Sequence, residues 1–291
     1  MKNMFERLFV AAACAAAVGN ASAVGLLGLT DANVLLRFDS STPGSVSSSA
    51  ITGLAGGESI VSIDYRNPNA TVYGLSSLGN LYALNAFTGA AAAFGSGVVP
   101  VVAAGVTYEL DWNPSNNNLR VIGNGAAPNS NRAFNFGNGS TAVQTALSIF
   151  GSAVVPNVVG AGYASNFAGS PAATLPLYYI DGATDALYVN TNAFAGGVLS
   201  KVGDLTLSGV PFGVNNPSGF EIHANGVGYV SWRENLYTID LGSGALTPQG
   251  SIGANFNVIG LTTMPIPEPG TYALMAVGLL GIGAMVRRQR G

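Results

Sequence analysis

The chain has little of the chemistry that most catalytic and metal sites depend on. It contains one cysteine, Cys14, and one histidine, His223, in 291 residues, and only 9% of its residues are charged. A single histidine excludes a histidine cluster for a metal, and a Ser-His-Asp triad would depend on it alone. The sequence has no Gly-x-Ser-x-Gly elbow and no phosphate-binding Gly-x-x-x-x-Gly-Lys-Ser/Thr loop. We therefore expect neither a metal nor a cofactor.

The few charges also argue against a nucleic-acid partner. Between Val24 and Ile266 there are twelve acidic and six basic residues, and the basic residues are scattered. No basic patch is present that could neutralise a phosphate backbone. The same region has no run of the roughly 20 apolar residues that a membrane-spanning helix needs. Low charge with abundant glycine, alanine, serine and asparagine is typical of an extracellular, loop-rich β protein.

The N-terminus has the three parts of a secretory signal peptide. Lys2 and Arg7 are followed by the apolar run Leu8 to Val18 and by the small residues Ala21-Ser22-Ala23. Cleavage after Ala23 would remove residues 1–23 as the signal peptide. Cys14 would be lost with them, which would leave a mature chain without a thiol. An alternative is a lipoprotein signal in which Cys14 is acylated, but its lead-in and the short apolar run before it favour ordinary cleavage.

The C-terminus carries the most specific pattern in the chain. Pro267, Glu268 and Pro269 precede an apolar segment, Tyr272 to Val286, which a cluster of three arginines follows. Positive charge stays on the cytoplasmic side of a membrane, so the apolar segment is expected to enter the bilayer as a helix. The pattern resembles the PEP-CTERM sorting tail of Gram-negative bacteria. The resemblance implies that an exosortase recognises residues 265–291 and removes them; the alternative is a permanent membrane anchor.

A short segment, Leu81–Gly89, recurs four more times at intervals of roughly fifty residues. Each copy is an alternating apolar strand that ends at Asp or Asn and continues into a small turn with a glycine. The other copies are Leu35–Gly44, Asn131–Gly139, Leu187–Gly196 and Leu236–Gly244. The closing residues are Asp39, Asn85, Asn135, Asn190 and Asp240. Their side-chain oxygens are expected to cap these turns rather than to bind calcium.

The repeats predict an all-β fold, a five-bladed β-propeller over residues 24–264. Each unit has about four short antiparallel strands, which is the composition of a propeller blade. The first unit lacks a leading strand, and the chain ends with an extra one, Val258–Thr263. Pairing this strand with the first blade would close the ring and leave no open edge. Six blades remain the alternative, because Ser140–Val159 could hide another blade or a short helix.

The body also resembles a bacterial domain-of-unknown-function family of secreted, propeller-like proteins. The resemblance rests on the opening Gly28-Leu29-Thr30, on Leu35-Leu36-Arg37-Phe38-Asp39, and on blade segments such as Ser62–Arg66 and Leu81–Asn85. It spans about Gly28 to Thr263 and implies the fold, but no reaction.

The ends of the leading strands provide the candidate site. Side chains two residues apart share one face of a strand, which pairs acidic residues with polar ones. The candidates are Asp64 with Arg66, Asp111 with Asn113, and Glu221 with His223. Leading strands lie innermost in a ring of blades, so these six side chains are expected to converge on one mouth of the central channel and bind a ligand. The alternative is structural: Asp64 and Asp111 cap the following turns, and Glu221 and His223 face solvent.

These features predict an exported protein of the cell surface, outer membrane or exopolysaccharide matrix with a non-catalytic binding or structural role. Its expected partners are exosortase-type sorting machinery, the membrane through the tail before processing, and exopolysaccharide. The rival prediction is an extracellular carbohydrate-active or ester hydrolase that uses the carboxylates at the channel mouth.

Overall fold

The structure, a computed structural model, describes residues 23–95, 97–98, 107–116, 118–124, 131–164, 175–191, 197–214, 218–253 and 255–263. Ala21 of the expected cleavage site and the whole expected sorting tail, with Pro267, Glu268 and Pro269, lie outside these residues. Within the described part of the chain, no helix is both long enough and apolar enough to cross a membrane.

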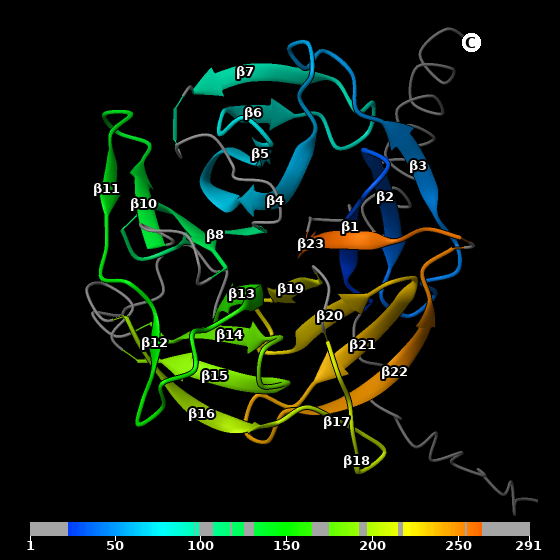
Figure 1. Cartoon of the computed structure of the whole chain (residues 1–291). Helices are drawn as coiled ribbons and strands as arrows, with labels where there is room; N and C mark the ends of the chain where they lie inside the picture. Colours follow the sequence, from blue (N-terminus) through cyan, green and yellow to red (C-terminus); the bar gives the residue numbers. More distant parts are fainter. Residues whose placement is uncertain are drawn as a thin grey trace, which may run out of the picture.

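Five antiparallel sheets, which we number as blades 1 to 5, are arranged around a common centre (Figure 1). Blade 1 contains β1 (Gly25–Thr30), β2 (Val34–Asp39), β3 (Ser47–Ala50) and β23 (Val258–Thr263). Blade 2 contains β4 (Ile60–Arg66), β5 (Thr71–Ser76), β6 (Leu81–Leu84) and β7 (Ala91–Gly95), with the short 3-10 helix η1 (Asn67–Asn69) between its first two strands. Blade 3 contains β8 (Tyr108–Asn113), β9 (Asn118–Gly123), β10 (Asn131–Asn135) and β11 (Thr141–Val143).

The last two blades each carry additional short strands. Blade 4 contains β13 (Val158–Tyr163), β14 (Leu177–Asp181), β15 (Ala186–Asn190) and β16 (Val198–Asp204), and β12 (Ser148–Ile149) adds to its outer edge in parallel. Blade 5 contains β19 (Gly219–Ile222), β20 (Gly228–Trp232), β21 (Asn235–Ile239) and β22 (Ala245–Ser251), extended by β17 (Thr206–Leu207) and β18 (Val210–Pro211). The predicted five-bladed propeller is therefore confirmed.

The C-terminal strand closes the ring as predicted. β23 pairs antiparallel with β1, with Gly28 opposite Leu261, and becomes the innermost strand of blade 1. The innermost strands β23, β4, β8, β13 and β19 then contact one another in an unbroken cycle. Because the first and last described strands, β1 and β23, pair in one sheet, separating them would expose two unpaired strand edges.

Five separate apolar clusters fill the spaces between neighbouring blades. Blades 2 and 3, for example, bury Tyr73 and Leu81 against Trp112 and Phe134. Successive residues of a strand point to opposite faces, and each face of a blade packs on a neighbour. This explains why inner and central strands such as β1 and β8 are buried along their whole length. It also explains why alternation of apolar and polar residues is weak in them.

The repeated Asp and Asn residues cap their turns as expected. The Asn85 side-chain oxygen accepts the Phe87 and Thr88 N–H groups, and Gly89 follows with a positive φ of 75°. Asp39, Asn135 and Asp240 accept N–H groups two residues further on. Residues 192–196, where the cap of Asn190 would lie, are outside the described ranges, so this cap stays a prediction.

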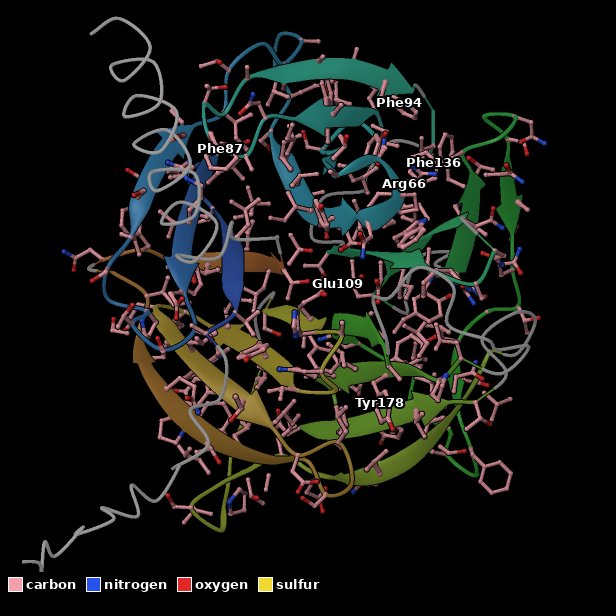
Figure 2. All side chains as sticks on the ribbon, turned by 180° about the vertical axis from the view of Figure 1, so that it is seen from behind. Arg66, Phe87, Phe94, Glu109, Phe136 and Tyr178 are labelled. Carbon is pink, nitrogen blue, oxygen red and sulfur yellow. The ribbon has the colours of Figure 1, made fainter. Side chains whose placement is uncertain are left out.

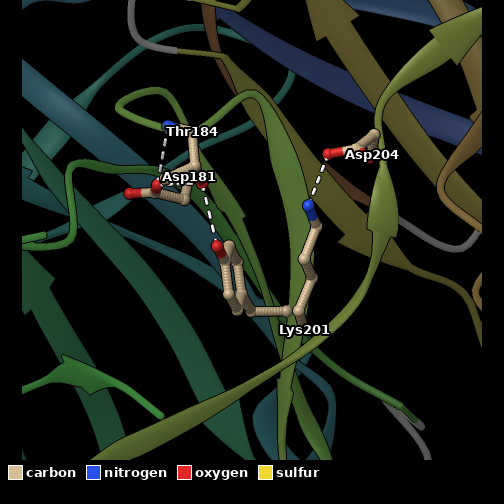
Figure 3. Close-up of polar contacts among 5 residues, drawn as sticks. Asp181, Thr184, Lys201 and Asp204 are labelled. Atoms are coloured by element: carbon tan, nitrogen blue, oxygen red, sulfur yellow. Dashed lines mark hydrogen bonds and ion pairs between the residues drawn. The ribbon is translucent and has the colours of Figure 1, made fainter. Parts of the chain in front are cut away.

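Blade 4 has a further polar turn between β14 and β15 (Figure 3). The buried Asp181 carboxylate accepts hydrogen bonds from the N–H and hydroxyl of Thr184, at 3.0 and 2.6 Å. The Thr184 hydroxyl also lies 3.0 Å from that of Tyr188. On the neighbouring strand Lys201 pairs with Asp204 at 2.6 Å in an exposed ion pair, which contributes little stability.

The segment Ser140–Val159 holds no sixth blade and no helix. Its residues form β11 at the outer edge of blade 3, then β12, and finally the start of β13. β12 pairs with β16, so this segment links blades 3 and 4 along their outer edges. The six-bladed alternative is therefore wrong.

Inner strands approach one another most closely where one of them has glycine. A Cβ added to Gly219 of β19 would lie 2.3 Å from both the N and the Cβ of Leu261 on β23. Gly56, in the loop before β4, has open space around it and no positive φ.

We predict that Gly219→Ala lowers the free energy of unfolding by about 1–3 kcal/mol, because overpacking forces the blade 5–blade 1 contact apart. Urea denaturation should show Gly56→Ala within about 0.5 kcal/mol of the wild type. Equal effects of the two substitutions would contradict the close approach of β19 and β23.

Candidate functional site

Three of the predicted site residues lie at one repeated position of the inner strands. Asp64 of β4, Asp111 of β8 and Glu221 of β19 are buried, at 2%, 4% and 3% exposure. In the other two blades the same position holds Gly162 of β13 and Thr262 of β23. We call these five residues the ring position.

Four of the five ring-position residues have side chains that reach the following blade. Asp64 accepts the Trp112 N–H of blade 3 at 2.5 Å, and Asp111 accepts the Tyr163 N–H of blade 4. Glu221 accepts the Thr263 hydroxyl of blade 1 at 2.9 Å. The Thr262 hydroxyl accepts the Tyr65 N–H of blade 2 at 3.0 Å and donates to Asp64 at 2.9 Å. The acidic side chains therefore link consecutive blades.

Blade 4 has no such link, because its ring-position residue is Gly162. A Cβ added there would lie 3.5 Å from the Ile222 nitrogen, which is the equivalent N–H of blade 5. Blades 4 and 5 are instead joined three residues before the ring position. There the Ser218 hydroxyl and N–H both donate to the Val159 carbonyl, at 2.9 and 3.0 Å.

Burial changes the protonation of these carboxyl groups. It raises the pKa of Asp64 to about 7, against the effect of hydrogen bonds from Thr262, Trp112 and Tyr65. Burial also raises the pKa of Asp111 well above its usual range, and the negative charges of Asp64 and Glu221 add to the effect. The three carboxyl groups are therefore near enough to influence one another across the ring.

A fourth inner-strand carboxyl group, Glu109, was missed by sequence reasoning. It lies on β8 two residues before Asp111, is 4% exposed, and is seen near the centre of the ring in Figure 2. Burial raises its pKa well above the usual range. The period of two along β8 could have indicated it, because Glu109 shares a strand face with Asp111 and Asn113.

The other predicted site residues contact different groups. The Arg66 guanidinium lies 4.7 Å from the centre of the Phe136 ring and 5.9 Å from that of Trp112. Asn113 accepts the Ser115 N–H at 2.9 Å and donates to the Tyr163 hydroxyl at 3.1 Å. His223 accepts the Asn225 N–H at 3.3 Å within its own turn.

The structural alternative is wrong about the contacts of Asp64 and Asp111 and about the exposure of Glu221. Asp64 and Asp111 bind the next blade instead of capping their own turns, and Glu221 does not face solvent. Asn113 is the residue that caps the turn after β8. Ligand binding by the six predicted residues stays a prediction.

A polar pocket of about 180 Å³ lies between blades 3 and 4, beside the predicted site residue Asn113. It is lined by Asn113, Asn116, Asn118, Arg120, Gln144 and Tyr163, together with Ala133. Arg120 is 5% exposed and donates to the Asn131 side chain at 2.9 Å and to the Tyr163 hydroxyl at 3.3 Å. Convergent polar groups in a small concave site are typical of ligand binding.

A larger, open groove of about 710 Å³ is lined by residues of blade 2. Its lining is mostly alanine and other apolar groups, with Phe87 and Tyr65 among them. Arg37 packs on Phe87 and donates to the Ala86 and Phe87 carbonyls, at 2.6 and 3.0 Å. The groove has apolar surface but few converging polar groups.

An aromatic cluster lies on the surface between blades 2 and 3. Phe94 is 46% exposed, and its ring centre is 4.9 Å from that of Tyr73 and 5.7 Å from that of Phe136. Figure 2 shows Arg66, Phe94 and Phe136 gathered at this edge of the molecule. We call Arg66, Tyr73, Phe94 and Phe136 the aromatic surface.

No group of three or more His, Cys, Asp or Glu side chains that could hold a metal ion occurs in the described part of the chain. The hydrogen bonds of Asp64, Asp111 and Glu221 link neighbouring blades.

The raised pKa values make stability depend on pH. The folded protein keeps protons that unfolded carboxyl groups, with pKa values near 4, release. The free energy of unfolding should therefore decrease as pH rises from about 4 through about 7. Glu109→Gln removes one such group, so at pH 8 we expect it to be more stable than the wild type, and its free energy of unfolding to decrease less between pH 4 and pH 8. Denaturant titrations at several pH values measure this.

The matched control is Glu234→Gln, at an exposed position in the turn between β20 and β21. It should leave the pH dependence unchanged. If Glu109→Gln also leaves the slope of stability against pH unchanged, Glu109 is not a buried acid in the folded state.

Two family models match this chain. Residues 34–262 match the model of a domain of unknown function, DUF4394, and residues 265–289 match the PEP-CTERM protein-sorting motif. The motif indicates an exported protein of the cell envelope or surface that exosortase-type machinery processes. No curated protein matches the chain.

Solved structures show only distant likenesses. A structural genomics protein of unknown function from Bacteroides thetaiotaomicron is 12% identical, with 84% of this chain and 64% of that chain covered and a TM-score of 0.47. A chain of the nidogen/laminin complex is 13% identical, with 84% and 85% covered and a TM-score of 0.36. At these values neither likeness indicates an activity. The family model spans most of the chain, which therefore belongs to the DUF4394 family of domains of unknown function.

Proposed function

We propose that this protein is a non-catalytic binding or structural component of the cell surface or exopolysaccharide matrix, delivered there by its sorting tail. The observation that carries the proposal is the use of the inner-strand acids. Asp64, Asp111 and Glu221 each accept a hydrogen bond from the next blade. A carboxylate that holds the ring together is not free to act on a substrate.

The rival hydrolase would need two of these carboxylates to flank a scissile bond in an accessible site. Their burial speaks against that use, since all three are less than 5% exposed. Moving any of them toward a substrate would break a contact between blades. The binding proposal needs no such movement.

The aromatic surface is the place where we propose that a polysaccharide chain lies. Sugar rings stack on aromatic side chains through their apolar faces, and Phe94 offers a half-exposed ring. Arg66 beside it supplies hydrogen-bond donors, and a charge suited to acidic sugars. An extended chain can follow such an open surface, whereas a closed pocket would admit only one end of it.

The test is a co-sedimentation assay of the exported protein with purified matrix polysaccharide. We expect retention of the wild type and a several-fold loss for Phe94→Ala, because one stacked sugar is worth about 1 kcal/mol. Phe150→Ala is the matched control: Phe150 is 78% exposed but lies on the link between blades 3 and 4. It should leave retention unchanged.

Absence of retention on every polysaccharide tested would contradict the proposal. Release of reducing sugar ends or of ester-bound acids by the wild type would support the rival hydrolase instead.

A further inference from the structure

The pocket between blades 3 and 4 is lined by two polar groups that lack a hydrogen-bond partner among the described residues. The first is the hydrogen of the Tyr163 hydroxyl. The oxygen accepts from Arg120 Nε at 3.3 Å and from Asn113 Nδ2 at 3.1 Å, which occupies both of its lone pairs. No acceptor for its own proton is found among the described residues. The hydroxyl therefore remains a donor for a molecule in the pocket.

The second is the Asn118 side-chain oxygen, which is buried and has no hydrogen-bond donor among the described residues. Asn118 begins β9, and Arg120 follows it two residues later on the same strand face. Buried polar atoms without a partner are uncommon in folded proteins, and each calls for an explanation. A donor supplied by a ligand would satisfy this one.

The remaining lining limits the size and chemistry of that ligand. The volume of about 180 Å³ suits one small polar molecule and excludes an extended chain. Asn116 and Gln144 add amide groups at the exposed side, and Ala133 supplies a small apolar patch. A site with a donor, an acceptor and a small apolar patch matches a sugar ring, which carries neighbouring hydroxyl groups and an apolar face.

Two further contacts hold the pocket in shape. Arg120 is tied to Asn131 at 2.9 Å, and the Asn131 amide donates to the Thr145 carbonyl at 2.9 Å. Arg120 and Asn113 thus position the Tyr163 hydroxyl from two directions, across the boundary between the blades. A preformed arrangement of this kind binds without the entropy cost of ordering side chains.

We infer that this pocket binds a single hydroxylated sugar residue at the end of a glycan, with one hydroxyl donating to Asn118 and another accepting from Tyr163. The inference rests on the proposed glycan-binding function but concerns a different surface. The aromatic surface would hold the length of a chain, and the pocket would hold its terminal residue.

The experiment is saturation-transfer difference NMR on the full exported protein with single monosaccharides: glucose, galactose, mannose, N-acetylglucosamine and glucuronate. We expect saturable binding of at least one of them. Asn118→Ala should weaken it about tenfold and leave the melting temperature unchanged or higher, because no protein contact of the side-chain oxygen is lost. Ala133→Leu should abolish binding by filling the pocket.

The matched controls are Gln249→Ala and Ala93→Leu, at exposed positions on β22 and β7 outside the pocket. Both should bind like the wild type. If no monosaccharide binds, or if binding survives Ala133→Leu, the pocket holds only water and the inference is wrong. Retention on polysaccharide through Phe94 would persist in that case, so failure here is distinguishable from failure of the proposed function.

Discussion

The structure depends on one repeated interaction, in which a polar side chain on four of the five inner strands binds the inner strand of the next blade. A propeller blade has hydrogen bonds within its own sheet, but neighbouring blades meet mainly through apolar side chains, which set no register. The ring-position contacts of Asp64, Asp111, Glu221 and Thr262 supply that register. An intramolecular hydrogen bond contributes roughly 0.5–1.5 kcal/mol net, so together these contacts matter for a ring that must close.

Burying these acidic side chains between the blades destabilises their charged forms. Several carboxyl groups share a dry interior, where burial and mutual repulsion raise the pKa values of Asp64 and Asp111. The same groups are buried, and Asp64, Asp111 and Glu221 each accept a hydrogen bond from the next blade. Accessible polar and aromatic chemistry is found instead toward the boundaries of blade 3: the aromatic surface on one side and the polar pocket on the other.

Much of the architecture could be predicted from the sequence, because it depends on local patterns. The turn residues around Asn85 and Asp240 recur in every copy, and the extra strand Val258–Thr263 matched the missing strand of the first blade. The partners of Asp64 and Asp111 could not be predicted, since they lie about fifty residues away in the next blade. The pocket could not be predicted for the same reason. Asn118 and Tyr163 belong to different blades, and nothing in either local segment indicates that they line the same pocket.

The most direct test of the central claim is hydrogen exchange at the Tyr163 amide, measured by NMR in the wild type and in Asp111→Ala. If Asp111 links blades 3 and 4, this amide exchanges in the wild type only through large-scale unfolding, and the substitution accelerates it at least tenfold. The amide of Val230, on a central strand of blade 5, should change only by any difference in global stability. Equal acceleration at Tyr163 and Val230 would contradict the account, because the carboxylate would then not protect the neighbouring blade.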